Sequence, residues 1–249
     1  MQEWVLVGGA LAVGFAVGLS GFADALVASA VWLHVLPPLD TAVMIYLSGL
    51  FVHGWSLLHL RHSLDWGRLA PFLLTGATGT PIGLWLTGHA DPTVMRPVLG
   101  GFLIFFSVWG LWRLLGARLP ERSPDLPDKA RGARLVDAGV GGLGGVLGGL
   151  GGLSGVLPAL RCAHRGWSPA EQRAVYQPFI FLMHALALGL ILFQAERLPD
   201  GSGVRFLIVL PALVAGMGAG LTFYGKLPER AFRLTLLGLV LVSGLTLIA

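Results

Sequence analysis

The sequence predicts an all-α integral membrane protein composed of two inverted repeats. This expectation rests on composition, on the lengths of the apolar segments and on an internal duplication. Only 12% of the 249 residues are charged, whereas soluble domains carry about 25%. A transmembrane helix needs about 20 apolar residues, and several stretches are that long. The apolar segments are residues 4–36, 41–60, 69–88, 98–112, 136–160, 174–195, 206–225 and 234–249. They leave no room for a separate soluble domain.

The second half of the chain repeats the first. At an offset of 131 residues three pairs of the rarer residue types align, namely Pro38 with Pro169, Asp40 with Glu171, and His53 with His184. After a shift of six residues the alignment continues with Arg68 on Arg205 and Arg96 on Arg233. Such a duplication predicts repeated structural units. We therefore expect one membrane repeat at 1–118, a polar cytoplasmic linker at 119–134 and a second membrane repeat at 135–249.

The distribution of Lys and Arg predicts the topology. Each repeat has four apolar segments, and the first is long enough to be re-entrant or to form two short crossings. In either case 14 of the 17 basic residues share one side of the membrane, whereas eight single crossings divide them 10 to 7. The positive-inside rule favours the first arrangement. An odd number of crossings per repeat inverts the second repeat, a construction common in transporters. We expect a multi-pass protein of the cytoplasmic membrane, with both termini outside the cytoplasm.

Glycine is concentrated where the first segment of each repeat is expected to break. Residues 139–155 contain ten glycines, and the breaks are predicted at 18–24 and 148–155. Non-helical backbone near mid-membrane is tolerated only against protein or a water-filled cavity. A half-helix that begins there directs unpaired N–H groups and a positive dipole end at the midplane, which favours an anion. The alternative is close helix packing through small residues, and both roles can coexist.

Three stretches resemble signatures of a known family. They are GLSGFADALVASAVWLHVLPP (18–38), RHSLDWGRLAPFLLTGATGTPIGLWL (61–86) and GGLGGLSGVLPALRCAHRGWSPAEQRA (148–174). They are similar to the TauE/SafE sulfite exporter family, also called the toluene-sulfonate uptake permeases, and the similarity spans nearly the whole chain. The resemblance implies a secondary transporter of small sulfur-containing or organic anions, such as sulfite or sulfonates. Ala23, Asp24, Ala25 and Ala30 depart from the family pattern and leave the substrate open.

Candidate substrate-binding residues come from the breaks and from the segment that follows each break. The breaks supply Ser20, Gly21, Phe22, Ala23, Gly152, Leu153, Ser154 and Gly155, and the following segments supply Tyr46, His53, Gln177 and His184. Inverted repeats are expected to place His53 and His184 at similar depth, facing each other. Histidine can donate a hydrogen bond to an anion and titrates near neutral pH. Asp24, His53 and His184 are therefore proton-coupling candidates, although Asp24 is alternatively a helix N-cap and the histidines are alternatively packing residues.

The remaining features exclude several classes of function. Cys162 is the single cysteine and fits neither an internal disulfide nor a metal site. We find no catalytic constellation and no nucleotide-binding motif, and we expect no metal, cofactor or nucleic-acid partner. The expected partners are a small anion and the lipid bilayer, with a homodimer left open. Arg161 is expected to snorkel to the lipid headgroups. The alternatives to a carrier are a non-transporting membrane assembly factor and a channel-like anion pore.

Overall fold

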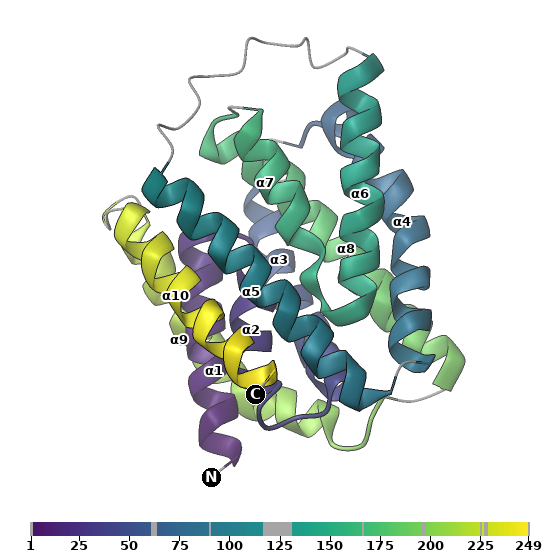
Figure 1. Ribbon diagram of the computed structural model, residues 1–249, viewed down its shortest axis with the longest axis vertical. Helices are drawn as coiled ribbons and strands as arrows, with labels where there is room; N and C mark the ends of the chain where they lie inside the picture. The colour runs from purple at the N-terminus through teal and green to yellow at the C-terminus, as the bar shows by residue number, and fades with distance from the viewer. Residues whose placement is uncertain are drawn as a thin grey trace.

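The computed structural model describes residues 2–60, 64–89, 91–116, 131–165, 167–195, 198–224, 226 and 229–248, and these fold as a helical bundle (Figure 1). Within these ranges there is no strand, which confirms the all-α prediction. The helices are α1 (Gln2–Ser20), α2 (Asp24–Trp32), α3 (Pro38–Leu60), α4 (Trp66–His89), α5 (Pro92–Gly116), α6 (Arg131–Gly151), the 3-10 turn η1 (Leu153–Gly155), α7 (Val156–His164), α8 (Pro169–Ala195), α9 (Ser202–Phe223) and α10 (Glu229–Ile248).

Six of the described helices are long and apolar enough to cross a membrane, namely α1, α3, α4, α5, α8 and α9. Their outer faces carry large apolar side chains, such as Phe105, Trp112 and Phe193, that are more than two-thirds exposed. Exposed apolar surface of this extent is unusual in a water-soluble protein and suits contact with lipid. The chain is therefore an integral, multi-pass membrane protein, as the sequence predicted.

The first segment of each predicted repeat is a helical hairpin whose tip lies inside the bundle. The first break falls between α1 and α2, where the Trp32 indole donates to the Leu6 carbonyl at 3.3 Å. The second falls between α6 and α7, where Arg161 Nε lies 2.7 Å from Asp137 Oδ1. These contacts show that each short helix returns beside the helix before it, so each segment enters and leaves at the same end of the bundle. The ion pair also corrects the expectation for Arg161, which binds a buried carboxylate instead of reaching for headgroups.

The most extensive helix contacts join the two halves of the chain. Helix α1 packs on α9, α6 on α4, α3 on α8, and α5 on α10, so each pair takes one helix from each predicted repeat. The inversion of the repeats stays a prediction. Helix α6 begins at Arg131, so the last four residues of the expected linker are helical, and the rest of that linker lies outside the described residues.

Glycine allows the α4–α6 and α1–α9 pairs to approach until their backbones touch. A Cβ on Gly145 of α6 would overlap the Gly76 carbonyl of α4, and a Cβ on Gly14 of α1 would overlap the Leu213 carbonyl of α9. Small residues at such interfaces replace the hydrophobic driving force that is missing between helices in lipid. The glycine-rich stretch at 139–155 thus serves close packing along α6 as well as the break that follows it.

We predict that Gly145→Ala lowers the free energy of unfolding by about 1–3 kcal/mol, because the added methyl group overpacks the α4–α6 contact. The matched control is Gly139→Ala, earlier on α6, where a Cβ meets nothing within 4 Å. Thermal unfolding of the purified protein in detergent should show a lower Tm for the first variant only. Equal Tm values for the two variants would contradict the close approach of these helices.

Candidate functional site

The tips of the two hairpins meet in the interior of the bundle. The backbone at Gly155 approaches the Phe22 carbonyl, so that a Cβ on Gly155 would lie 3.5 Å from the Phe22 oxygen. Gly21 and Gly152 have φ values of 85° and 76°, in the left-handed region that glycine tolerates best. Each residue ends a long helix by donating its N–H to the carbonyl four residues earlier, at 2.7 Å; the acceptors are Val17 and Gly148. These two amides are therefore already committed to the ends of α1 and α6.

One face of α8 satisfies the carbonyl groups that α1 leaves unpaired at its end. Arg173, Tyr176 and Gln177 are spaced as i, i+3 and i+4, so they lie together on that face. Their side chains donate to the carbonyls of Leu19, Ser20 and Gly21 at 2.8, 2.8 and 3.2 Å. The last carbonyls of a helix have no partner within the helix. Gln177, which was expected to donate to an anion, instead donates its amide to the first break.

Side chains of α3, α4 and α8 donate to the carbonyl groups at and just after the end of α6. The Tyr46 hydroxyl lies 2.9 Å from the Gly148 carbonyl and 3.1 Å from the Gly149 carbonyl, and it donates to both. The Thr87 hydroxyl lies 3.0 Å from the Leu150 carbonyl. Tyr46 was also expected to donate to an anion, but its hydrogen is engaged by backbone oxygens. Its position shows a structural role in holding the second hairpin.

Three ionisable side chains meet beside the tips. His53 Nε2 lies 3.2 Å from Asp24 Oδ2, and His184 Nδ1 lies 4.0 Å from the same oxygen. The two imidazole centroids are 6.2 Å apart, and no more than 3% of any of the three side chains is exposed. The structure thus brings together the two histidines that the duplication paired, with the aspartate between them. Gly49 makes the space, because a Cβ there would overlap the His184 ring.

Asp24 is not the N-cap of α2. The capping position is Ala23, and no side-chain hydrogen bond caps this helix. Asp24 is the first helical residue, where the positive end of the helix dipole favours a carboxylate. The alternative interpretation of Asp24 as a capping residue is therefore wrong, and its carboxylate instead faces the two histidines.

The hydrogen bonds of the triad (Asp24, His53 and His184) define where its protons lie. His184 Nε2 is 3.0 Å from the Gly152 carbonyl, and a carbonyl only accepts, so Nε2 carries a hydrogen. In a neutral imidazole the other nitrogen then has a lone pair, which here faces the Asp24 carboxylate. Two acceptors in this position repel, and an ionised Asp24 between neutral histidines leaves the buried triad with a charge of −1. One added proton would remove both penalties.

Four buried polar atoms near the tips have no hydrogen-bond partner among the described residues. They are His53 Nδ1, His184 Nδ1, Ser154 Oγ and Gln177 Oε1. Leaving a buried polar group unpaired costs about 1–3 kcal/mol, and a bound ligand or water can supply the missing partner. The described His, Cys, Asp and Glu residues include no group of three that could hold a metal ion.

The other predicted tip residues contribute mainly backbone and apolar surface. The Ser20 hydroxyl donates to the Ala16 carbonyl at 2.8 Å and thus stays on its own helix. The Phe22 ring packs edge-on against Tyr176, with centroids 5.7 Å apart. Ala23, Leu153 and Ser154 are fully buried. Ser154 is thus the one predicted tip side chain with an unpaired hydroxyl.

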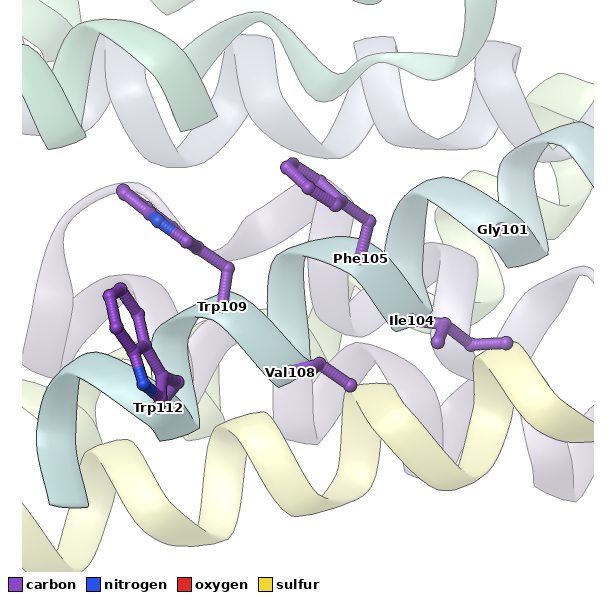
Figure 2. Close-up of a pocket in the computed structure, with 6 residues that line it drawn as sticks. All are labelled: Gly101, Ile104, Phe105, Val108, Trp109 and Trp112. Carbon is purple, nitrogen blue, oxygen red and sulfur yellow. The ribbon is translucent and has the colours of Figure 1, made fainter. Parts of the chain in front are cut away.

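A pocket of about 440 Å³ lies along α5 (Figure 2), and none of the triad residues lines it. Its lining residues are Gly101, Ile104, Phe105, Val108, Trp109 and Trp112. None of them is charged, and Phe105 and Trp112 belong to the exposed apolar surface. The pocket is therefore part of the lipid-facing side of α5 and does not contribute to the candidate site.

A family model for the sulfite exporter TauE/SafE family matches residues 6–247, nearly the whole chain. The chain belongs to this family. The resemblance noted from the three sequence stretches is thereby confirmed, and with it the assignment to a family of membrane transporters of sulfur compounds. Comparison with curated proteins and with solved structures found no match.

Several residues of the site in this TauE/SafE protein escaped the sequence analysis. Thr87, Arg173 and Tyr176 bind the broken helix ends, and Gly49 makes room for His184. A signal existed for two of them, because Arg173 and Tyr176 share a helix face with Gln177. No pattern marked Thr87 or Gly49, since their roles depend on which helices become neighbours.

We predict that Tyr46→Phe destabilises this TauE/SafE protein by about 1 kcal/mol, because the Gly148 carbonyl loses its side-chain donor and the Gly149 carbonyl keeps only that of Thr87. Tyr224→Phe is the control, since Tyr224 is 45% exposed at the end of α9. Thermal unfolding in detergent measures both, and a lower Tm is expected for Tyr46→Phe alone. An unchanged Tm for this variant would mean that the Tyr46 hydroxyl does not hold the second hairpin.

Proposed function

We propose that this TauE/SafE protein is a secondary transporter of a small sulfur-containing anion of the sulfite or sulfonate class. It moves the anion across the cytoplasmic membrane by alternating access, and one proton accompanies each anion. The observation that carries the proposal is the buried triad of Asp24, His53 and His184 where the two hairpin tips meet. Ionisable groups inside a membrane are costly, and by default they indicate a functional site. The family description, sulfite exporter, supports a sulfur-containing anion as the substrate.

The two breaks are chemically unequal, which supports separate roles for them. In the duplication Asp24 aligns with Gly155, so a carboxylate stands at the start of α2, whereas the residue before Val156, the first of α7, is glycine. A helix N-terminus without its own carboxylate favours an external anion. Beside it lies Ser154, whose buried hydroxyl has no partner. The anion is therefore assigned to the start of α7 and the proton to the triad at the start of α2.

Electrostatics links the two sites. An ionised Asp24 repels an anion at the neighbouring tip, and buried charges are poorly screened. A proton on the triad removes that repulsion, so proton binding and anion binding favour each other. His184 adds a physical link, because it approaches Asp24 of the first hairpin and donates to the Gly152 carbonyl of the second.

Alternating access requires two bodies that can rock about a fixed site, and the inverted repeats are proposed as those bodies. The crossing of α3 and α8 supports the inversion. Gly49 of α3 lies against His184 of α8, and Gly54, further along α3, lies against the earlier residue Phe181 of α8. The two helices therefore run antiparallel, and the equivalent residues His53 and His184 meet at the crossing.

The substrate is tested by uptake into liposomes that contain the purified protein. Labelled sulfite, sulfate, a small sulfonate and a carboxylate are compared with and without an inward proton gradient. We expect saturable uptake of a sulfur-containing anion, and acceleration of that uptake by unlabelled anion inside. Acceleration of this kind distinguishes a carrier from a channel-like pore. Uptake of none of the four by folded protein would contradict the proposed substrate class and favour the non-transporting alternative.

Proton coupling has a separate prediction. With one proton for each monovalent anion, a gradient of one pH unit drives about tenfold accumulation. We expect Asp24→Asn to abolish accumulation while it preserves exchange of labelled for unlabelled anion, because the variant keeps the size of the side chain and removes its titratable group. Asp91→Asn is the matched control, since Asp91 lies in the turn before α5 and accepts hydrogen bonds from Thr93. Gradient-driven accumulation by Asp24→Asn would exclude the triad as the coupling site.

The proposed orientation can be tested without a substrate. We expect both the N- and the C-terminus outside the cytoplasm, with the segment between α5 and α6 inside, as the positive-inside rule requires. Reporter fusions active only in the periplasm or only in the cytoplasm, placed at each terminus and after α5, measure this. Two cytoplasmic termini would overturn the proposed orientation.

A further inference from the structure

Two ion pairs connect the predicted repeats to each other. Arg68 Nη1 of α4 lies 2.8 Å from Glu171 Oε1 of α8, and Arg205 Nη1 of α9 lies 2.7 Å from Asp40 Oδ2 of α3. These four residues are the ones that the duplication aligns, Arg68 with Arg205 and Asp40 with Glu171. Each arginine therefore binds the acid of the other repeat, and the two contacts are equivalent.

The two ion pairs lie on opposite sides of the triad. Asp40 and Glu171 are in the first turns of α3 and α8, and these helices run antiparallel where His53 and His184 meet. Each acid precedes the histidine of its own helix by 13 residues, which corresponds to about 20 Å at 1.5 Å per residue. One ion pair thus lies about 20 Å from the triad toward each end of the α3–α8 pair.

An apolar cluster lies between each ion pair and the triad. At the Arg68 end the cluster joins α4, α7 and α8 and includes Leu69, Cys162 and Phe179. At the Arg205 end it joins α3, α4 and α8 and includes Ala42, Leu84 and Ala187. These six side chains are at most 6% exposed. Together, an ion pair and an apolar cluster separate the triad from either end.

We propose that the two ion pairs are alternate gates, so that release of Arg68 from Glu171 opens one end of the protein and release of Arg205 from Asp40 opens the other. The inference rests on the proposed carrier function. The structure, with both contacts formed and the triad buried, represents the closed state between the two openings. A carrier must never open both ends together. If one ion pair must form before the other breaks, the two equivalent pairs prevent both ends from opening at once.

The local chemistry suits repeated breaking and re-formation. Both pairs are partly exposed, with 19–44% of each side chain accessible, and such ion pairs contribute little net stability. Glu171 is held by a capping box, because its Oε2 accepts the Ser168 N–H at 2.8 Å while the Ser168 hydroxyl accepts the Glu171 N–H at 3.3 Å. Arg68 also pairs with Asp65 of its own repeat at 3.3 Å. In the Arg68–Glu171 pair the acid is therefore the fixed partner, and the arginine keeps a second partner when it leaves.

Cysteine labelling tests the gates without any substrate. The native Cys162 lies beneath the Arg68 gate, and Ala187→Cys in a Cys162→Ala background places a reporter beneath the Arg205 gate. We expect Arg68→Gln to raise the rate of alkylation of Cys162 by a water-soluble maleimide roughly two- to fivefold, the equilibrium shift that loss of an exposed ion pair supports. The same variant should not raise labelling of Ala187→Cys. Arg205→Gln should show the reverse pattern.

Controls separate gating from general loosening. Arg134→Gln removes an exposed arginine of α6 and should change neither rate. The charge reversal Arg205→Asp with Asp40→Arg should restore the low labelling of Ala187→Cys. Equal increases at both reporters, or no increase at either, would overturn the gate proposal. Because the readout is labelling, the gates and the substrate can fail separately. Selective opening without transport of any sulfur-containing anion would refute the proposed substrate and leave the gate proposal standing. Transport without selective opening would refute the gate proposal alone.

Discussion

The structure depends on one constraint, which is that backbone carbonyls at the ends of two helices inside the bundle must find donors. Helices α1 and α6 both stop within the membrane protein, where water cannot pair with their last carbonyls. The donors come from helices far away in the sequence, with Arg173, Tyr176 and Gln177 at one break and Tyr46 and Thr87 at the other. These bonds fix α3, α4 and α8 against the hairpins and thereby locate the site.

This use of donors explains which polar groups remain for function. Tyr46 and the Gln177 amide are committed to backbone, and His184 uses one nitrogen on the Gly152 carbonyl. The second nitrogen of His184 and the Ser154 hydroxyl stay buried and unpaired. These unpaired groups support the proposed coupling of proton and anion. His184 donates to the second hairpin and faces the Asp24 carboxylate of the first.

The two halves of the chain are equivalent at some positions and differ at one position in the candidate site. Where the halves agree, as in the two arginine–acid pairs, the two contacts are equivalent and suit the proposed motion that exchanges the two ends. The halves differ at Asp24, whose counterpart is Gly155, and there the site acquires a single carboxylate. In the proposed mechanism, a symmetric scaffold with one asymmetric charge allows the repeats to exchange roles while only one break binds the proton.

The sequence by itself determined the helical class, the membrane setting, the family, the positions of both breaks and the pairing of His53 with His184. These features depend on composition, on local glycine content and on repeated residues, all of which are readable along one chain. Only the tertiary structure decided that Tyr46 and Gln177 bind backbone, that Arg161 pairs with Asp137, and that Asp24 lies between the histidines. The reason is physical. A side chain's partner depends on which helices become neighbours, and in a membrane protein nearly every face is apolar, so the sequence pattern does not distinguish one neighbour from another.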